Sequence, residues 1–138
     1  MTVYVDDMYL HEMGEYNSPS GRVYKMSHMI ADTREELVEM ARAIGLNTRH
    51  IQKRGTYSEH FDIAKVKREL AIGHGAVQIT MRQCSAMCVR RRATGELGRP
   101  DEAEAWRDAQ FAARRAQLAT YADDAQRAFA ADLPGAPA

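Results

Sequence analysis

The sequence predicts an α/β fold: a small mixed sheet with helices packed on it, followed by a long C-terminal helical extension. Short runs rich in β-favouring residues, typical of strands, lie at residues 2–5, 22–30 and 76–80. Between them, apolar residues recur at helical spacing, so strands and helices alternate along the chain. After residue 100 the sequence becomes Ala-rich, which favours one long helix.

The first helix has the clearest local signals. Asp32 is predicted to be its N-cap, with Glu35 completing a capping box, and Gly45 is predicted to end it. Its apolar face repeats at positions i, i+3, i+4 and i+7, and comprises Leu37, Met40, Ala41 and Ile44.

The segment after this helix is less regular. Residues 49–52 are expected to form a strand and residues 53–56 a turn. A second helix of about eleven residues follows His60-Phe61-Asp62 and ends at Gly73 or Gly75. The side chains expected to face inward from this helix and from the last strand are Val66, Leu70, Ala71, Val77 and Ile79.

The chain is predicted to divide into an α/β domain at 1–92, a hinge at 93–100, a C-terminal helix at 101–133 and a frayed tail at 134–138. Gly95, Gly98 and Pro100 mark the hinge. The apolar stripe of the helix is narrow and comprises Phe111, Leu118, Ala122, Ala125 and Phe129. Such a helix lies on its own domain or pairs with another chain, which would make a homodimer.

Composition bounds the class of protein. The 138 residues are 45% hydrophobic and 28% charged, which indicates a globular domain. The sequence shows neither a membrane-spanning apolar run nor a signal peptide, so we expect a cytoplasmic protein, with no membrane partner. Cys84 and Cys88 form a C-x3-C pair, which we interpret as reduced structural thiols.

The net charge is zero, which argues against a protein that coats nucleic acid, but a local basic segment remains at Arg90-Arg91-Arg92.

Several short motifs together resemble a known family. They are Val3-Tyr4-Val5-Asp6-Asp7, Ser27-His28-Met29-Ile30-Ala31-Asp32-Thr33 with Glu36-Leu37, His60-Phe61-Asp62-Ile63, Lys67-Arg68, Ala71-Ile72 and Gly75-Ala76. Over residues 2–82 the chain is similar to domain-of-unknown-function family 4031, a family of short bacterial and phage proteins. It departs from the family at Met26, near which members often have an aromatic residue, and at Phe61, where they have Tyr. The resemblance implies a related fold but no activity, because the family has none established. A short, methionine-rich member with an appended helix looks like a phage or prophage product.

Two acids stand directly after the first strand. Asp6 and Asp7 occupy its carboxyl end, where ligands gather in open α/β sheets. Since neighbouring residues of an extended chain point to opposite faces, one of the two is expected to face a site. The alternative is that both are solvated turn residues.

Two histidine–aspartate pairs are the next candidates. His28 and Asp32 bracket a strand-to-helix junction, and His60 and Asp62 have an H-x-D spacing that puts both on one side of an extended segment. Histidines with carboxylates can bind a divalent metal. Alternatively, Asp32 and Asp62 are helix N-caps and His28 is a hydrogen-bonded interior residue.

Two functional hypotheses follow. The first is a metal-dependent phosphoesterase or nuclease-like enzyme that acts on a nucleotide or nucleic-acid phosphate with Mn²⁺, Mg²⁺ or Zn²⁺. In this hypothesis the metal ligands are Asp7 and His60, the supporting catalytic residues are Asp6, His28 and Asp62, and Lys67 or Arg68 neutralises phosphate. Lys67 and Arg68 are otherwise an exposed, salt-bridged helix face.

The second hypothesis is a non-enzymatic phage-type accessory protein. It would bind a host protein or nucleic acid through the basic segment and the C-terminal helix. A narrower version of the first hypothesis, binding of a nucleotide or small metabolite without turnover, needs no metal.

Overall fold

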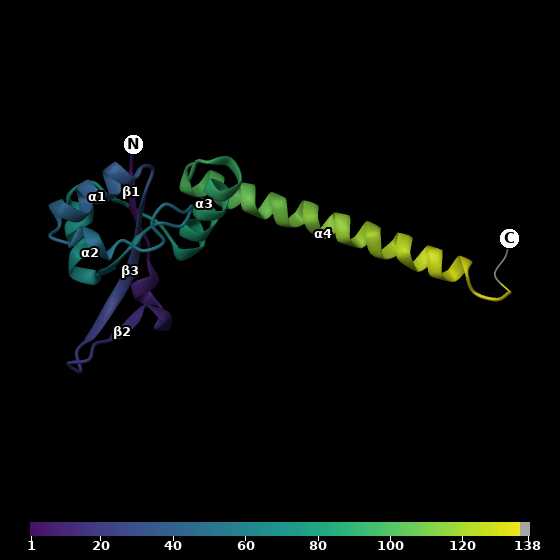
Figure 1. The fold of residues 1–138 in the computed structure, drawn as a ribbon, viewed down its shortest axis with the longest axis horizontal. Helices are drawn as coiled ribbons and strands as arrows, with labels where there is room; N and C mark the ends of the chain where they lie inside the picture. The colour runs from purple at the N-terminus through teal and green to yellow at the C-terminus, as the bar shows by residue number, and fades with distance from the viewer. Residues whose placement is uncertain (136–138) are drawn as a thin grey trace. The chain divides into compact units, whose positions relative to one another are not determined.

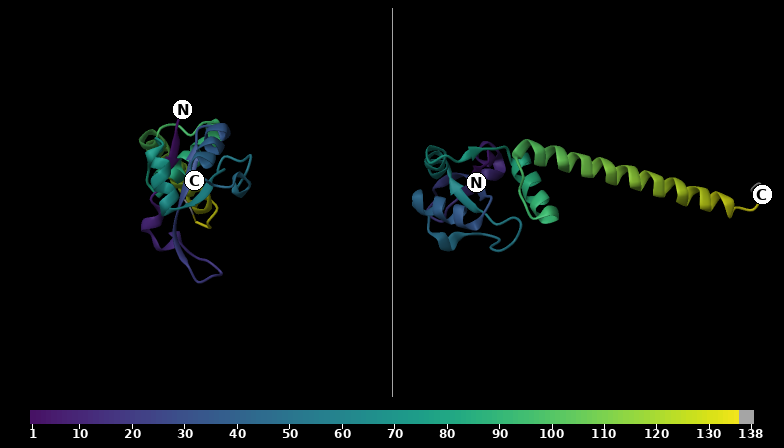
Figure 2. Two further views of the ribbon diagram at one scale, coloured as in Figure 1. Left: turned by 90° about the vertical axis from the view of Figure 1, so that its left-hand side faces the viewer. Right: turned by 90° about the horizontal axis from the view of Figure 1, so that it is seen from above.

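The computed structural model describes residues 1–135, and the chain divides into two compact units, Met1–Glu104 and Ala105–Ala138. The first unit contains a five-stranded mixed sheet with helices on both faces (Figures 1 and 2). The predicted α/β fold with a small mixed sheet is therefore confirmed. Of the expected frayed tail, residues 134 and 135 lie in a turn, and residues 136–138 lie outside the described residues.

The sheet is organised around β3 (Val23–Ala31). This strand pairs antiparallel with β1 (Val3–Val5), β2 (Glu15–Asn17) and β4 (Phe61–Ala64). β1 and β4 both pair with Met29, so they flank the carboxyl-terminal half of β3 on opposite sides. β1 also pairs in parallel with β5 (Val77–Gln78), which makes the sheet mixed.

Helices cover the two faces of the sheet separately. α1 (Arg34–Ala43) and α2 (Lys65–Gly73) contribute to a core that contains Val5, Met29 and Ile63. α3 (Met81–Thr94) contributes to a second core, with Tyr4 and Ile30 from the other face. Adjacent residues of β1 and β3 thus enter different cores, as the period of two requires. Three short 3₁₀ turns complete the unit: η1 (Met8–Leu10), η2 (Glu12–Gly14) and η3 (Thr48–His50).

The predicted N-cap of the first helix is wrong by one residue. Thr33 caps α1, because its hydroxyl accepts a hydrogen bond from the Glu36 amide at 3.2 Å and donates one to the Glu36 carboxylate at 2.9 Å. Asp32 instead accepts a hydrogen bond from the Thr2 amide at 2.9 Å, which ties the chain start to the end of β3. Gly45, with φ of +79°, ends the helix as predicted.

The alternative in which Asp62 is a helix N-cap is also wrong. Asp62 lies inside β4, and α2 begins only at Lys65 with Ala64 as its N-cap. Pairing with β3 keeps the chain extended through Ala64, so the inward face of the helix differs from the predicted one. Val66 is exposed, as is Leu70, whereas Ala71 is buried as predicted.

Two further segments differ from expectation. Residues 49–52 form η3 and a single bridge between Gln52 and His60 rather than a strand, while Lys53–Thr56 make the predicted turn. The last strand is shorter than predicted and comprises only Val77–Gln78. Ile79, just after it, is buried as predicted, but Val77 is 42% exposed, because pairing with β1 places it at an open edge of the described sheet.

α3 was not predicted, although its sequence carries a start and a stop signal. Thr80 and Gln83 form a complete capping box at its start, and Gly95, with φ of +88°, ends it. The final helix, α4 (Pro100–Ala131), agrees with the predicted extension at 101–133. Within residues 1–135 no helix combines the length and apolar character needed to cross a membrane.

Candidate metal centre

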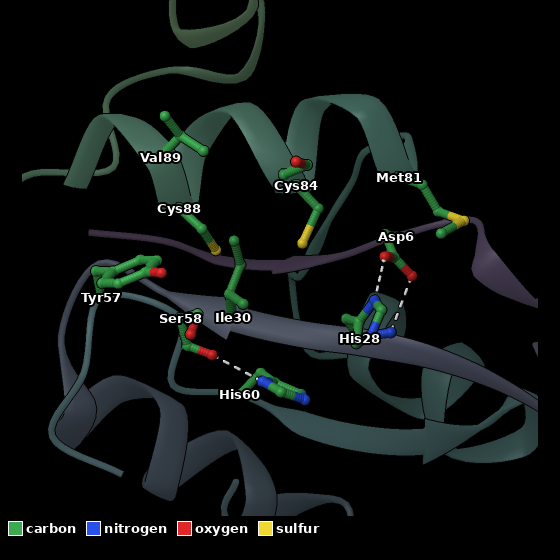
Figure 3. Close-up of a pocket in the computed structure, with 11 residues that line it drawn as sticks. Asp6, His28, Ile30, Tyr57, Ser58, His60, Met81, Cys84, Cys88 and Val89 are labelled. Atoms are coloured by element: carbon green, nitrogen blue, oxygen red, sulfur yellow. Dashed lines mark hydrogen bonds and ion pairs between the residues drawn. The ribbon is translucent and has the colours of Figure 1, made fainter. Parts of the chain in front are cut away.

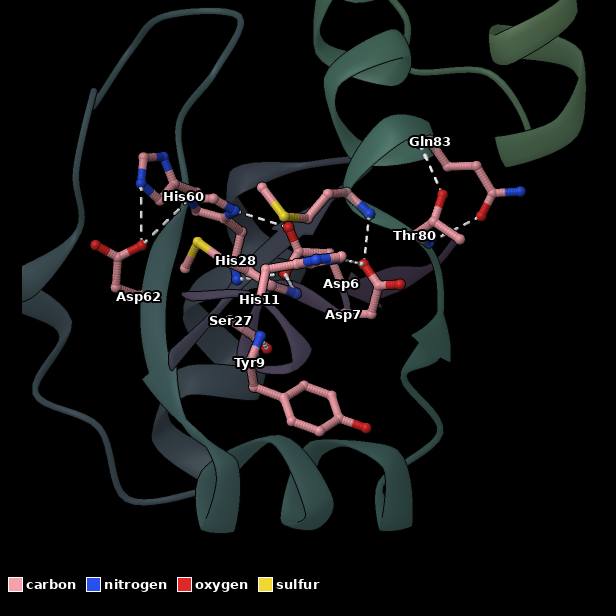
Figure 4. Close-up of polar contacts among 12 residues, drawn as sticks. Asp6, Asp7, Tyr9, His11, Ser27, His28, His60, Asp62, Thr80 and Gln83 are labelled. Atoms are coloured by element: carbon pink, nitrogen blue, oxygen red, sulfur yellow. Dashed lines mark hydrogen bonds and ion pairs between the residues drawn. The ribbon is translucent and has the colours of Figure 1, made fainter. Parts of the chain in front are cut away.

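Strand pairing brings four of the predicted site residues together. His28 on β3 lies directly opposite Asp62 on β4, and His60 precedes Asp62 by two residues on the same side. Asp6 follows β1, and its amide donates a hydrogen bond to the His28 carbonyl at 3.0 Å. Figure 4 shows Asp6, His28, His60 and Asp62 close together, with Asp6 and Asp62 on either side of His28. The site therefore depends on the register of three adjacent strands.

Asp6 orients His28. Its side chain is fully buried, and its Oδ2 lies 2.7 Å from His28 Nδ1. Its Oδ1 accepts hydrogen bonds from the amides of His28 at 2.9 Å and Met8 at 3.2 Å. Because the carboxylate can only accept, His28 Nδ1 carries a hydrogen, and in the neutral ring Nε2 presents its lone pair.

His60 is oriented in the same sense by a backbone carbonyl. Its Nδ1 lies 2.7 Å from the Ser58 carbonyl oxygen and donates to it, which again leaves Nε2 as the ligand atom of the neutral ring. The rings of His28 and His60 meet edge to face, with centroids 5.1 Å apart. Each histidine thus has one nitrogen fixed by the protein and one directed to a shared space.

Asp62 completes that shared space. Its Oδ1 lies 3.7 Å from His28 Nε2 and 3.5 Å from His60 Nε2. Its Oδ2 accepts a hydrogen bond from the Gln52 side chain at 2.6 Å. Oδ1 itself is buried and has no hydrogen-bond partner within the described part of the chain. A buried carboxylate oxygen without a donor is costly unless a cation approaches it.

The titration of this group follows from these contacts. Burial lowers the pKa of His60, but the contact with Asp62 and the hydrogen bond to Ser58 more than offset it, so the pKa lies above 6.5. The contact with His60 lowers the pKa of Asp62 below 3.8 despite burial of the carboxyl group, with a further contribution from Gln52. The space between them therefore favours a positive charge.

Two separations between the candidate ligand atoms fit a transition metal, and the three atoms all lie within 4.8 Å of one another. A tetrahedral zinc ion with bonds of about 2.0–2.1 Å holds its ligand atoms about 3.4 Å apart. The 3.5 and 3.7 Å separations from Asp62 Oδ1 are close to this value. Among the described residues, Asp6, His28 and Cys84 form a second group of three potential ligands. In that group, however, the hydrogen bond between Asp6 and His28 already occupies one atom of each.

A pocket opens beside the histidines, between the sheet and α3. Its volume is about 320 Å³, and its lining includes Asp6, His28 and His60 (Figure 3). The other lining residues are mostly apolar or contain sulfur: Ile30, Tyr57, Ser58, Met81, Cys84, Ser85, Cys88 and Val89. Sequence reasoning missed Cys84 and Cys88 as site residues because the helix that carries them was not predicted. Their C-x3-C spacing was the available signal.

Three predicted site residues lie elsewhere. Asp7 Oδ1 accepts a hydrogen bond from the Met81 amide at 2.7 Å, at the start of α3, and is not a member of either ligand group. Lys67 donates to the Ile44 carbonyl at 2.8 Å, at the end of α1. Arg68 is buried and donates to the backbone oxygen of Asp6 at 2.8 Å, so it supports the site from behind.

The basic segment makes contacts within the domain, although Arg92 itself is exposed. Arg91 donates to the carbonyls of Tyr57 and Ala31, each at 2.9 Å, and the Arg92 guanidinium lies 5.4 Å from the centre of the Tyr57 ring. Arg90 donates to the Glu96 carbonyl at 3.0 Å. Arg91 and Arg92 thus both contact Tyr57, next to the Ser58 carbonyl that bonds His60, whereas Arg90 bonds the segment after α3.

Fold and site together define a mixed α/β domain with a histidine–aspartate cluster beneath a helix. A family model described as "Protein of unknown function (DUF4031)" matches residues 3–92. The chain belongs to this family, which confirms the sequence resemblance, and the match extends through most of α3. Comparison with curated proteins and with solved structures gave no match.

Proposed function

We propose that this protein is a metal-dependent hydrolase whose ion is bound by His28 Nε2, His60 Nε2 and Asp62 Oδ1. The observation that carries the proposal is the partnerless, buried Asp62 oxygen lying 3.5–3.7 Å from two histidine nitrogens. The Asp6 carboxylate and the Ser58 carbonyl each accept a hydrogen bond from the Nδ1 atom of one histidine and so orient its ring, as second-layer residues do in metal sites. Two histidines and one carboxylate favour Zn²⁺ over Mg²⁺, which prefers oxygen ligands.

Three protein ligands leave a coordination position for water. A metal ion lowers the pKa of its bound water, in favourable cases to about 7, and so supplies hydroxide at neutral pH. The pocket beside the ligands gives a substrate room to approach that water. The protein would hold the ion in place and surround it with partly apolar side chains that limit the access of bulk water.

The substrate class that we propose is a phosphoric ester of a small molecule. No lysine or arginine is among the residues that line the described pocket, so the metal itself would neutralise the phosphate. The predicted phosphate contacts from Lys67 and Arg68 have no support, because both side chains bond backbone oxygens elsewhere. The apolar wall formed by Ile30, Met81 and Val89 fits an ester's organic group better than a nucleic-acid backbone.

Calorimetric titration of the metal-free full chain with Zn²⁺, Mn²⁺ and Mg²⁺ tests the proposal directly. We expect one ion per chain and the tightest binding for Zn²⁺. Asp62→Asn should weaken Zn²⁺ binding at least tenfold, while Asp32→Asn, an exposed aspartate outside the cluster, should leave it unchanged. Absence of binding by the wild-type chain would refute the metal site.

Activity is measured next with the loaded protein on small phosphomonoesters and phosphodiesters, with carboxyl esters as the comparison. Hydrolysis lost in Asp62→Asn but kept in Asp32→Asn supports the proposed reaction. A loaded wild-type protein that hydrolyses only carboxyl esters would keep the site and overturn the substrate class.

One observation favours a second candidate, a protein that binds a partner through α4. Large apolar side chains on this helix are at least half exposed: Phe111, Leu118, Tyr121 and Phe129. If two copies pair through this stripe, the full chain sediments as a dimer and Leu118→Glu returns it to a monomer. If the wild-type chain sediments as a monomer, pairing of two copies through α4 is refuted, and only binding of a different protein to this helix remains.

A further inference from the structure

Two thiols face the metal pocket from α3. Cys84 and Cys88 are one helical turn apart, and Figure 3 shows both side chains directed from the helix towards the sheet. Both line the pocket that also contains His28 and His60. Cys84 is 7% exposed, whereas Cys88 is only partly buried. A small molecule in the pocket therefore meets Cys88 more readily than Cys84.

The surroundings of Cys88 favour its thiolate. The hydrogen bond with Cys84 lowers the pKa of Cys88 to about 7, against the effect of burial, and positive charge on Arg91 acts in the same direction. The same hydrogen bond, together with burial, raises the pKa of Cys84. The pair thus consists of one thiol that donates and one that ionises, and thiolates are the nucleophilic form.

We infer that Cys88 is a modification site at which a small uncharged disulfide forms a mixed disulfide within the pocket and thereby blocks the metal centre. Its role as a block rests on the proposed function. In the reaction the Cys88 thiol releases its proton to solvent, and its sulfur bonds one sulfur of the incoming disulfide. The original S–S bond breaks, and the other half leaves as a thiolate.

The pocket determines which disulfides react and what the product does. A volume of about 320 Å³ with apolar walls admits a small neutral reagent. The added group stays covalently attached next to His28 and His60, where it takes up space that a metal-bound water and a substrate need. Cys84 cannot replace Cys88, because burial keeps it away from the reagent. A thiol reductant reverses the modification, so the block is a redox switch.

The experiment uses the reduced, metal-free full chain with 2-hydroxyethyl disulfide at pH 7, a reagent that adds no metal ligand of its own. Intact mass and peptide mapping give the site and the rate, and calorimetry gives the Zn²⁺ affinity before and after modification. We expect one adduct, on Cys88, formed at least tenfold faster than any adduct on Cys84. We also expect Zn²⁺ affinity at least fivefold lower in the adduct, and restored once the adduct has been reduced with dithiothreitol and the reductant removed.

Two variants serve as matched controls. Cys88→Ser should take up no reagent and keep its Zn²⁺ affinity after treatment. Cys84→Ala should still react at Cys88 but about threefold more slowly, because loss of the hydrogen-bond donor lowers the thiolate fraction more than it raises nucleophilicity.

Equal labelling of the two cysteines, or none at Cys88, would overturn the inference. Labelling at Cys88 with unchanged Zn²⁺ affinity would refute the claim that modification of Cys88 blocks the metal site. If the untreated wild-type chain takes up no Zn²⁺, the proposed function fails instead, and the labelling result decides separately on Cys88.

Discussion

At the residue scale, the arrangement of protons decides whether the cluster can bind a metal. His28 and His60 each donate from Nδ1 to a fixed acceptor, the Asp6 carboxylate in one case and the Ser58 carbonyl in the other. Both Nε2 atoms are thereby directed to Asp62. In the proposed site Asp6 is consequently a positioning residue; the sequence hypothesis gave it a supporting role and gave the ligand role to Asp7.

Asp6→Asn tests this role. The new amide nitrogen would face His28 Nδ1 and donate to it, which moves the ring hydrogen to Nε2 and removes the lone pair from the ligand position. We expect Zn²⁺ affinity to fall by about 10–100-fold, the usual effect of losing an outer partner. Asp7→Asn is the control and should bind Zn²⁺ like the wild type. Equal losses in both variants would instead indicate a general structural effect.

A second prediction concerns pH. The pKa of His60 is raised above 6.5, and a protonated ring cannot bind metal, so protons compete with Zn²⁺ as pH falls through that pKa. Asp62, with its lowered pKa, stays ionised over the same range. Protonation of His60 alone should therefore lower the apparent Zn²⁺ affinity by up to tenfold per pH unit below its pKa. Calorimetry in two buffers of different ionisation enthalpy would detect the released proton, and pH-independent affinity would exclude His60 as a ligand.

At the scale of elements, α3 turns an exposed sheet face into a pocket. Its start is fixed by Thr80, which accepts a hydrogen bond from the Gln83 amide at 3.0 Å, while the Gln83 side chain accepts one from the Thr80 amide at 3.0 Å. Asp7 adds a third contact by accepting from the Met81 amide. The helix that carries both thiols is thus anchored at its first turn.

Thr80→Ala should lower the free energy of unfolding by about 1 kcal/mol, as expected for loss of an N-cap hydroxyl. Thr80→Ser, which keeps the hydroxyl, should change it much less. Urea denaturation followed by circular dichroism measures both. A Thr80→Ala variant as stable as the wild type would mean that Asp7 and Gln83 alone are sufficient to start the helix.

Some elements could be predicted from the sequence because their signals are local. The first strand, the second strand and the first helix follow from alternation, helical spacing and Gly45. The N-cap alternative for Asp62 failed because β4 exists only through pairing with β3, which is a long-range contact. For the same reason the sequence could identify His28, His60 and Asp62 as candidates but could not show that their side chains lie together. It also could not show that Asp7 instead bonds the start of α3.

At the scale of the molecule, the proposed metal site joins segments that are distant in the chain, because His28 lies on β3 whereas His60 and Asp62 lie just before and within β4. A ligand bound only by the folded state stabilises it by about 2.7 kcal/mol at a concentration 100 times its Kd. For a domain of this size, that corresponds to a rise in Tm of roughly 10 °C or more. We expect Zn²⁺ at this concentration to raise the Tm of the wild-type chain by this amount, and that of Asp62→Asn, with at least tenfold weaker binding, by about half as much or less. A similar rise in both would place the ion elsewhere.

The fixed hydrogen bonds behind the two histidines also bear on kinetics. Neither ring needs to rotate or exchange its hydrogen between nitrogens when an ion arrives, because Asp6 and Ser58 have already set both. Once the proton on His60 has left, capture should be limited by how fast the ion sheds its own hydration water. Ions that exchange water slowly, such as Ni²⁺, should then load much more slowly than Zn²⁺ into the same preformed cage.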